Sequence, residues 1–168
     1  LHCINITKPI RHSSHIMHTT FITAGAAQLG SCLQELIPAD TRIIAPNSAA
    51  FDLSQPHTLE KLLGTYRPNQ IINCVAYTNV DRSETQTDLA RRINADAVRV
   101  LAVYAAKPSI PLVHVSTDFV FDGRKRTPYG PNDETNPMNA YGATKLAGEL
   151  AAIEANPKTW VVRASGIY

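Results

Sequence analysis

Residues Thr19–Gly30 read TTFITAGAAQLG, and this stretch decides the fold. Its first five residues are β-branched or aromatic, which is typical of a buried strand. Four small residues follow at 24–27. The next run, Gln28–Ile37, carries leucines at helical spacing and ends at Pro38. A strand, a tight turn and a helix in this order are the first half of a βαβ unit, so we expect a parallel sheet.

The alternation of strand and helix continues along the rest of the chain. Its strands are apolar through their length, which is typical of a parallel sheet covered by helices on both faces. We therefore predict an α/β fold with a doubly wound parallel sheet, a Rossmann fold of three α/β/α layers. The expected strands are 19–23, 42–45, 50–53, 70–75, 111–116 and 159–163, and the expected helices are 28–37, 58–66, 89–106 and 139–155.

Length and composition restrict the function classes. The chain has 168 residues, enough for one domain with a sizeable core. Its net charge is only +2 and its basic residues are scattered, so we expect neither nucleic acid nor a membrane surface as a partner. No apolar run approaches the roughly 20 residues of a membrane span, and no secretory signal is recognisable. These features favour a cytoplasmic protein.

The polar residues 1–16 have no sustained period, and we predict a disordered leader there, with the dinucleotide-binding domain at 17–168. The cysteines, Cys3, Cys32 and Cys74, are far apart and odd in number, which indicates free thiols in a reducing compartment. We predict no metal site.

The turn after the first predicted strand is the first candidate site. A dinucleotide-binding turn needs small residues, because its backbone approaches a pyrophosphate and the following helix N-terminus faces that charge. If Gly30 ends a G-x-x-G-x-x-G pattern, Ala24 and Ala27 occupy the other two positions and Gly25 is displaced by one. By itself, this turn fits an ordinary strand–helix connection equally well.

Two later motifs add chemistry. In Tyr141–Lys145 the phenol and the ammonium are four residues apart, so a helix would place them on one face. The cation would then lower the pKa of the tyrosine toward a value useful for proton transfer. Ser116–Asp118 ends a predicted buried strand, where open α/β sheets bind ligands. Each motif alone is more often structural, but all three in this order favour an oxidoreductase.

Three longer stretches resemble the dTDP-4-dehydrorhamnose reductase family of extended short-chain dehydrogenases/reductases. They are 73–81 (NCVAYTNVD), 115–123 (VSTDFVFDG) and 136–149 (NPMNAYGATKLAGE), within a resemblance over roughly 19–168. It implies reduction of the C4 ketone of a nucleotide-linked 6-deoxysugar, dTDP-4-dehydro-L-rhamnose, in deoxysugar and cell-surface polysaccharide biosynthesis. The implied cofactor is NADPH, with NADH as the alternative, and the implied partners are the nucleotide-sugar substrate and a second subunit in a homodimer.

The resemblance also implies residue roles. Tyr141 would donate a proton to the reduced carbonyl, Lys145 would bind the nicotinamide ribose and tune Tyr141, and Thr117 would hydrogen-bond the substrate carbonyl. The remaining implied cofactor positions are Gln28, Leu29 and Gly30 at the pyrophosphate, Asp52 and Leu53 at the adenine end, and Ala76, Tyr77 and Thr78 along the cofactor.

The sequence departs from the family pattern in three ways. Ala24 and Ala27 stand in place of glycines. The family's Arg-Thr-Ser-Trp, whose tryptophan helps to hold the sugar, is replaced by Arg163-Ala164-Ser165-Gly166. The chain also lacks the smaller substrate-binding domain into which family members continue. The alternatives are therefore a non-catalytic dinucleotide-binding module, resembling the regulatory subunit of methionine adenosyltransferase, or an inactive fragment.

Overall fold

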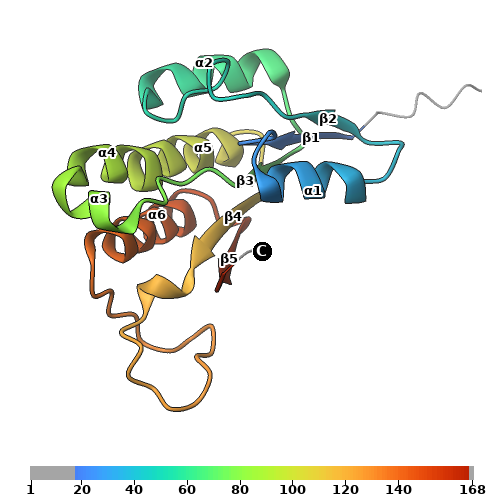
Figure 1. Ribbon diagram of the computed structural model, residues 1–168. Coiled ribbons are helices and arrows are strands. Elements are labelled where there is room, and N and C mark those ends of the chain that lie inside the picture. The colour runs from blue at the N-terminus through green and yellow to red at the C-terminus, as the bar shows by residue number, and fades with distance from the viewer. Residues whose placement is uncertain (1–17, 167–168) are drawn as a thin grey trace, which may run out of the picture.

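The computed structural model describes residues 18–166, so the leader predicted at 1–16 lies outside the described residues. Within them, five strands form one parallel sheet in the order β2-β1-β3-β4-β5 (Figure 1). The strands are β1 (Thr19–Ile22), β2 (Arg42–Ile44), β3 (Gln70–Asn73), β4 (Leu112–Thr117) and β5 (Thr159–Ala164). The helices are α1 (Gln28–Leu36), α2 (Pro56–Tyr66), α3 (Val80–Thr85), α4 (Thr87–Arg91), α5 (Ala97–Ala106) and α6 (Ala140–Ala155).

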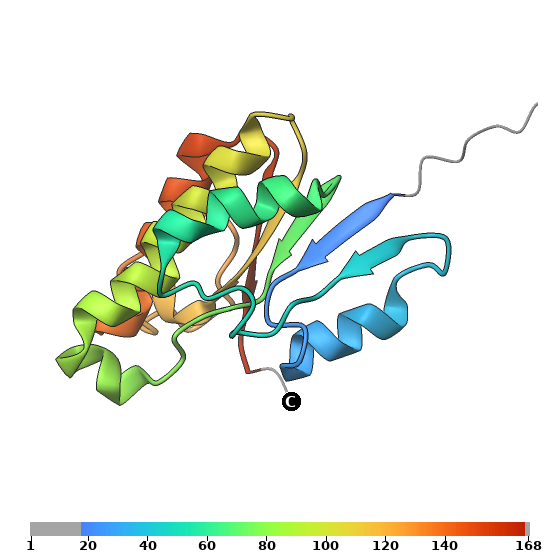
Figure 2. The same ribbon diagram turned by 90° about the horizontal axis from the view of Figure 1, so that it is seen from above.

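The helices cover the two faces of the sheet unequally. Figure 2 shows α1 on one face and α2, α5 and α6 together on the other. This arrangement confirms the predicted three-layer α/β/α fold. Among the described residues, no helix has the length and apolar character to cross a membrane.

The strand order creates a switch point between β1 and β3. The chain leaves β1 on one side to form β2 and then returns past β1 to form β3, which pairs with the opposite edge of β1. The loops after β1 and β3 therefore diverge, and the crevice between them is where open α/β sheets bind ligands.

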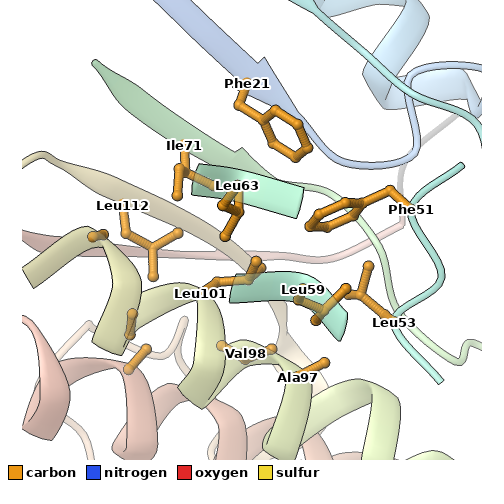
Figure 3. Packing of buried hydrophobic residues seen from close by; sticks show 13 residues of the cluster. Phe21, Phe51, Leu53, Leu59, Leu63, Ile71, Ala97, Val98, Leu101 and Leu112 are labelled. Carbon is orange, nitrogen blue, oxygen red and sulfur yellow. The ribbon is translucent and has the colours of Figure 1, made fainter. Parts of the chain in front are cut away.

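The core lies between the sheet and the layer of α2 and α5. Phe21, Ile71 and Leu112 project from three neighbouring strands and are fully buried. Leu63 and Leu101 meet them from the helices (Figure 3). Truncating one such leucine to alanine costs about 2–5 kcal/mol, so this cluster holds the sheet in register.

The strand predicted at 50–53 is wrong. These residues form turns, because the backbone N–H groups of Ala50 and Phe51 both donate to the Asn47 carbonyl oxygen, at 3.1 and 3.0 Å. Phe51 and Leu53 are nevertheless buried and belong to the core (Figure 3). Burial at alternate positions imitates a strand pattern here although the backbone has no strand partner among the described residues.

The long helix predicted at 89–106 is interrupted. It begins at Thr87 as α4, widens into a π-helical turn, η1 (Arg92–Asp96), and continues as α5. The preceding helix α3 was not predicted, because six residues are too few for a periodic pattern. A short 3-10 turn, η2 (Asp118–Val120), follows β4. The remaining predicted elements are confirmed, with ends shifted by up to two residues.

Candidate functional site

The turn after β1 packs tightly against its surroundings. A Cβ atom on Gly30 would overlap the Ala24 carbonyl oxygen and lie 2.9 Å from its carbon. A Cβ on Gly25 would overlap Ala45, with the Ala45 carbonyl oxygen at 2.7 Å. The displaced glycine therefore has a packing reason, since it lets the turn touch the segment after β2.

The two alanines of the turn have different backbones. Ala24, which stands in place of a glycine, has φ of +55°, a conformation that glycine adopts more readily. Ala27 has an ordinary φ of −82° and is the N-cap of α1. Because its side chain cannot cap, the first N–H groups of α1 are left for solvent or for an anion.

Thr23 joins the ends of β1 and β3 at the switch point. Its hydroxyl donates to the Asn73 Oδ1 atom at 2.7 Å and accepts the N–H groups of Cys74 and Val75 at 2.9 and 3.2 Å. Asn73 Nδ2 lies 3.0 Å from His114 Nδ1 on β4. This buried network joins the ends of β1 and β3 to the middle of β4 under the crevice.

A cavity of about 260 Å³ lies beside this turn. It contains four of the predicted cofactor residues, Asp52, Leu53, Ala76 and Tyr77, and Ala24 closes one side. The Asp52 carboxylate accepts the N–H and the hydroxyl of Ser54, both at 2.8 Å. The structure thus brings two residues expected at the adenine end next to two expected along the cofactor.

A second cavity, of about 340 Å³, lies at the carboxyl end of β4. The predicted site residues that line it are Thr117, Tyr141 and Lys145, together with Leu29, Ala76 and Thr78. Ala76 lines both cavities, so they adjoin. Gln28 and Gly30 line neither cavity: Gln28 is exposed at the start of α1, and Gly30 is buried under the turn.

Helix α6 presents the tyrosine and the lysine. Asn139 caps it by accepting the Gly142 N–H at 2.7 Å. Tyr141 stands at its second position, with its ring edge against Phe119 at 5.5 Å between ring centres. Lys145 is 1% exposed, and its Nζ atom donates to the Val115 carbonyl oxygen at 2.7 Å.

The predicted lowering of the Tyr141 pKa is wrong for this structure. Burial raises the pKa of Tyr141, the Thr117 hydroxyl opposes that rise, and the charge of Asp118 adds to it. The Lys145 ammonium is turned to the Val115 carbonyl oxygen and has no part in the shift. Tyr141 therefore holds its proton, as a proton donor must.

Sequence reasoning missed Asn94, which lies in the π-helical turn η1. Its side-chain Oδ1 accepts the Tyr77 N–H at 2.8 Å, and its Nδ2 donates to the Tyr77 carbonyl oxygen and to the Thr144 hydroxyl at 3.2 and 3.1 Å. A Cβ on Gly148 would overlap the Asn94 carbonyl oxygen, so α6 approaches η1 closely. Extra residues in π-helical turns often mark functional sites, but the periodicity of 89–106 predicted an unbroken helix, so the sequence carried no signal for Asn94.

Next to the lysine lie two buried polar atoms, one on Ser116, which belongs to a predicted motif, and one on His114, which was not predicted. In the described part of the chain, the Ser116 hydroxyl and the Nε2 atom of His114 have no hydrogen-bond partner. Ser116 lines the larger cavity, as does Cys74. Burial, followed by the charge of Lys145, holds the pKa of His114 well below its usual range, so this imidazole is neutral.

Comparisons with known proteins agree with this geometry. The RmlD substrate-binding domain family matches residues 17–168. A dTDP-4-dehydrorhamnose reductase from Sinorhizobium fredii is 36% identical over 147 residues, which are 88% of this chain and 50% of that protein. The corresponding reductase from Mycobacterium tuberculosis is 38% identical over 152 residues, 88% of this chain and 49% of that protein.

A solved structure has the same architecture. The dTDP-4-dehydrorhamnose reductase from Bacillus anthracis, crystallised with NADP, superposes with a TM-score of 0.87 at 36% identity, over 93% of this chain and 56% of that one. This chain thus spans about half the length of the relatives that it matches. Two of its curated relatives are named dTDP-4-dehydrorhamnose reductase, and the chain belongs to the RmlD substrate-binding domain family.

Proposed function

We propose that this chain is the dinucleotide-binding half of an NADPH-dependent dTDP-4-dehydrorhamnose reductase. The observation that supports this most is the meeting of Thr117, Tyr141 and Lys145 in one cavity that adjoins the switch point. Because the chain spans about half of its relatives, the activity, the sugar and the partners all belong to the proposal.

The residues fit a dinucleotide. The uncapped start of α1 suits the pyrophosphate, and the cavity around Asp52 and Leu53 suits the adenine end. Next to Lys145, the unpartnered Ser116 hydroxyl is a buried polar atom that a ligand could satisfy. We favour NADPH over NADH because the Bacillus anthracis relative was crystallised with NADP.

The proposed reduction needs a hydride and a proton. Bound NADPH would supply the hydride. Thr117 would donate a hydrogen bond to the carbonyl oxygen of the sugar, and Tyr141 would give its phenolic proton to that oxygen as negative charge develops. The raised pKa of Tyr141 supports this role, because the phenol stays protonated until the oxygen becomes basic.

The sugar side differs from the family pattern. Gly166, with φ of +51°, lines the larger cavity where the family pattern has a tryptophan. Without that indole, the sugar would be held less tightly from this side. The substrate class of the proposal is therefore a nucleotide-linked 4-keto-6-deoxysugar, with dTDP-4-dehydro-L-rhamnose as its first candidate.

A second function is binding without turnover, as in a regulatory module. The missing side chain at Gly166 favours it, because the tryptophan of the family pattern helps to hold the sugar. In that case the chain would bind the dinucleotide and leave the sugar unreduced.

Two finer expectations belong to the same proposal, a cytoplasmic location and a homodimer. Exposed Cys32 is a free thiol, which fits a reducing cytoplasm. A homodimer stays a prediction.

Thermal unfolding with NADPH or NADH tests cofactor binding. At 100 times its Kd, a ligand that binds only the folded state adds about 2.7 kcal/mol, which raises Tm by roughly 5–10 °C for a chain of this size. We expect this rise with NADPH, its loss in Lys145→Met, and its retention in Lys61→Met, which removes an exposed lysine from α2. A folded chain that neither cofactor stabilises would refute the proposal.

Turnover distinguishes the two functions. We expect this chain, completed with the C-terminal half of a full-length relative, to oxidise NADPH in the presence of the ketosugar. Tyr141→Phe in that protein should abolish oxidation while leaving the NADPH-induced rise in Tm. A completed protein that binds NADPH but leaves the sugar unreduced supports the regulatory alternative.

A further inference from the structure

A partly buried ion pair lies one helical turn beyond the lysine of the site. Glu149 follows Lys145 by four residues on α6 and is 1% exposed. Arg163 on β5 donates from Nε to Oε1 and Oε2 of Glu149, at 3.0 and 3.1 Å, and from Nη2 to Oε2 at 2.6 Å. Both carboxylate oxygens are therefore bound by one guanidinium, a geometry that fixes the pair.

Arg163 is itself held on its other side. Its Nη1 atom donates to the Pro131 carbonyl oxygen at 3.2 Å, and its guanidinium lies 5.0 Å from the centre of the Phe121 ring. Phe121 in turn stacks on Tyr129, with 4.2 Å between ring centres. The carboxylate is thus held between α6, β5 and the loop after β4, unlike the exposed pair of Lys107 and Glu60.

The environment of Lys145 disfavours its charge. Burial lowers the pKa of Lys145 to about 8, and the charge of Glu149 is the main influence that opposes this shift. The other opposing group, Cys74, has a pKa raised to about 11 by burial, so its thiol is uncharged near neutral pH. His114 on β4 is neutral there as well.

Three other acidic groups around α6 act elsewhere. Asp118 in η2 affects Tyr141. Glu84 on α3 accepts the Ala140 N–H at the start of α6, and Asp96 in η1 lies 3.9 Å from Arg91 at the surface. Near neutral pH, Glu149 is therefore the anion that acts on the buried ammonium.

We propose that Glu149, held in place by Arg163, is a positioning residue that keeps Lys145 protonated inside the cofactor cavity. This inference rests on the proposed function for its purpose, because the ammonium would hold the nicotinamide ribose. The charge relationship itself needs no cofactor. The two residues of the ion pair should act on the Lys145 ammonium in opposite directions. Loss of Glu149 leaves Lys145 near an unpaired guanidinium, which disfavours its charge. Loss of Arg163 leaves Lys145 near an unneutralised carboxylate, which favours its charge.

The test is a pH titration of the full chain labelled with ¹³C at lysine Cε, read by NMR without any cofactor. The Lys145 signal is the one missing from Lys145→Met, and we expect its midpoint near pH 8. Glu149→Gln should move this midpoint down by about 1 pH unit or more, and Arg163→Gln should move it up. Arg163→Lys, which keeps the charge, should restore most of the original midpoint. The matched control Glu60→Gln, at an exposed ion pair, should leave it unchanged.

If the ion pair had only a structural role, Glu149→Gln and Arg163→Gln would both destabilise the fold, but they would not shift the Lys145 titration midpoint in opposite directions. Unchanged midpoints, or two shifts of the same sign, overturn the proposal. If Glu149→Gln fails to fold, Arg163→Gln and the double variant Glu149→Gln/Arg163→Gln test the proposal instead. Arg163→Gln must raise the Lys145 midpoint, and the double variant must have a lower midpoint than Arg163→Gln.

A parallel measurement of NADPH affinity against pH separates this inference from the proposed function. We expect affinity to fall as pH rises through the Lys145 midpoint, and the fall to move with the midpoint in each variant. If the midpoints shift as stated while NADPH never binds, the positioning role holds and the cofactor role fails.

Discussion

Replacing Gly30 with alanine tests the packing that places α1 against the turn. The new Cβ would overlap the Ala24 carbonyl oxygen and lie 2.9 Å from the Ala24 carbon and 3.1 Å from the Gly25 Cα. All three are backbone atoms, so no flexible side chain can move aside, and α1 must shift instead. Overpacking of this kind costs about 1–3 kcal/mol.

Helix propensity acts in the opposite direction and needs its own control. Alanine is better than glycine inside a helix by about 0.8–1.0 kcal/mol. Gly64→Ala on α2 measures this gain alone, because a Cβ there meets nothing within 4 Å. We expect Gly64→Ala to raise Tm by about 2–4 °C and Gly30→Ala to lie about 2–12 °C below it.

Thermal unfolding followed by circular dichroism gives both Tm values, and NADPH titration of each variant gives the functional consequence. Since α1 must move, the N–H groups at its start lose their position, and we expect Gly30→Ala to weaken NADPH binding while Gly64→Ala does not. Equal Tm values for the two variants would refute the reasoning, because the contact with Ala24 would then carry no cost.

Two further predictions concern the buried polar groups. Asn94→Ala should leave the Tyr77 N–H without its partner and cost about 1–3 kcal/mol of unfolding free energy, with faster hydrogen exchange at Tyr77; unchanged exchange would exclude Asn94 as the anchor of this loop. Burial depresses the pKa of His114 in the folded state below 6.5, so the stability that its neutral form contributes is present above that pH and is lost as pH falls further. His114→Gln should flatten the dependence of unfolding free energy on pH below 6.5, and an unaltered slope would assign the acid sensitivity to other groups.

The layers of the fold follow from the apolar runs in the sequence. β3 lies within the predicted strand 70–75, and β4 differs from the predicted strand 111–116 by one residue at each end, because strands of a sheet covered by helices are apolar throughout. The start of α6 was predictable as well, since Asn139 is a strong N-cap residue and small residues follow it.

Tertiary contacts explain the errors. Phe51 and Leu53 are buried at alternate positions, yet their backbone forms turns because Asn47 accepts the N–H groups that a strand would use. The four-residue spacing of Tyr141 and Lys145 predicted a shared helix face, and both side chains line the same cavity. It could not predict that the ammonium would donate to Val115, because that carbonyl comes from a strand 30 residues earlier.

The turn after β1 shows why its glycine pattern was ambiguous. Gly25 and Gly30 both serve close packing, one against Ala45 and the other against Ala24, while the left-handed backbone falls on an alanine. Such a backbone costs a non-glycine residue about 1–2 kcal/mol, and it persists only where the surroundings impose it. Here Thr23, the residue before Ala24, is hydrogen-bonded to Asn73 on β3. On the other side, the Ala27 N–H donates to the Ala24 carbonyl oxygen at 2.9 Å. The fold therefore keeps a left-handed turn at Ala24, although the sequence has no glycine at that position.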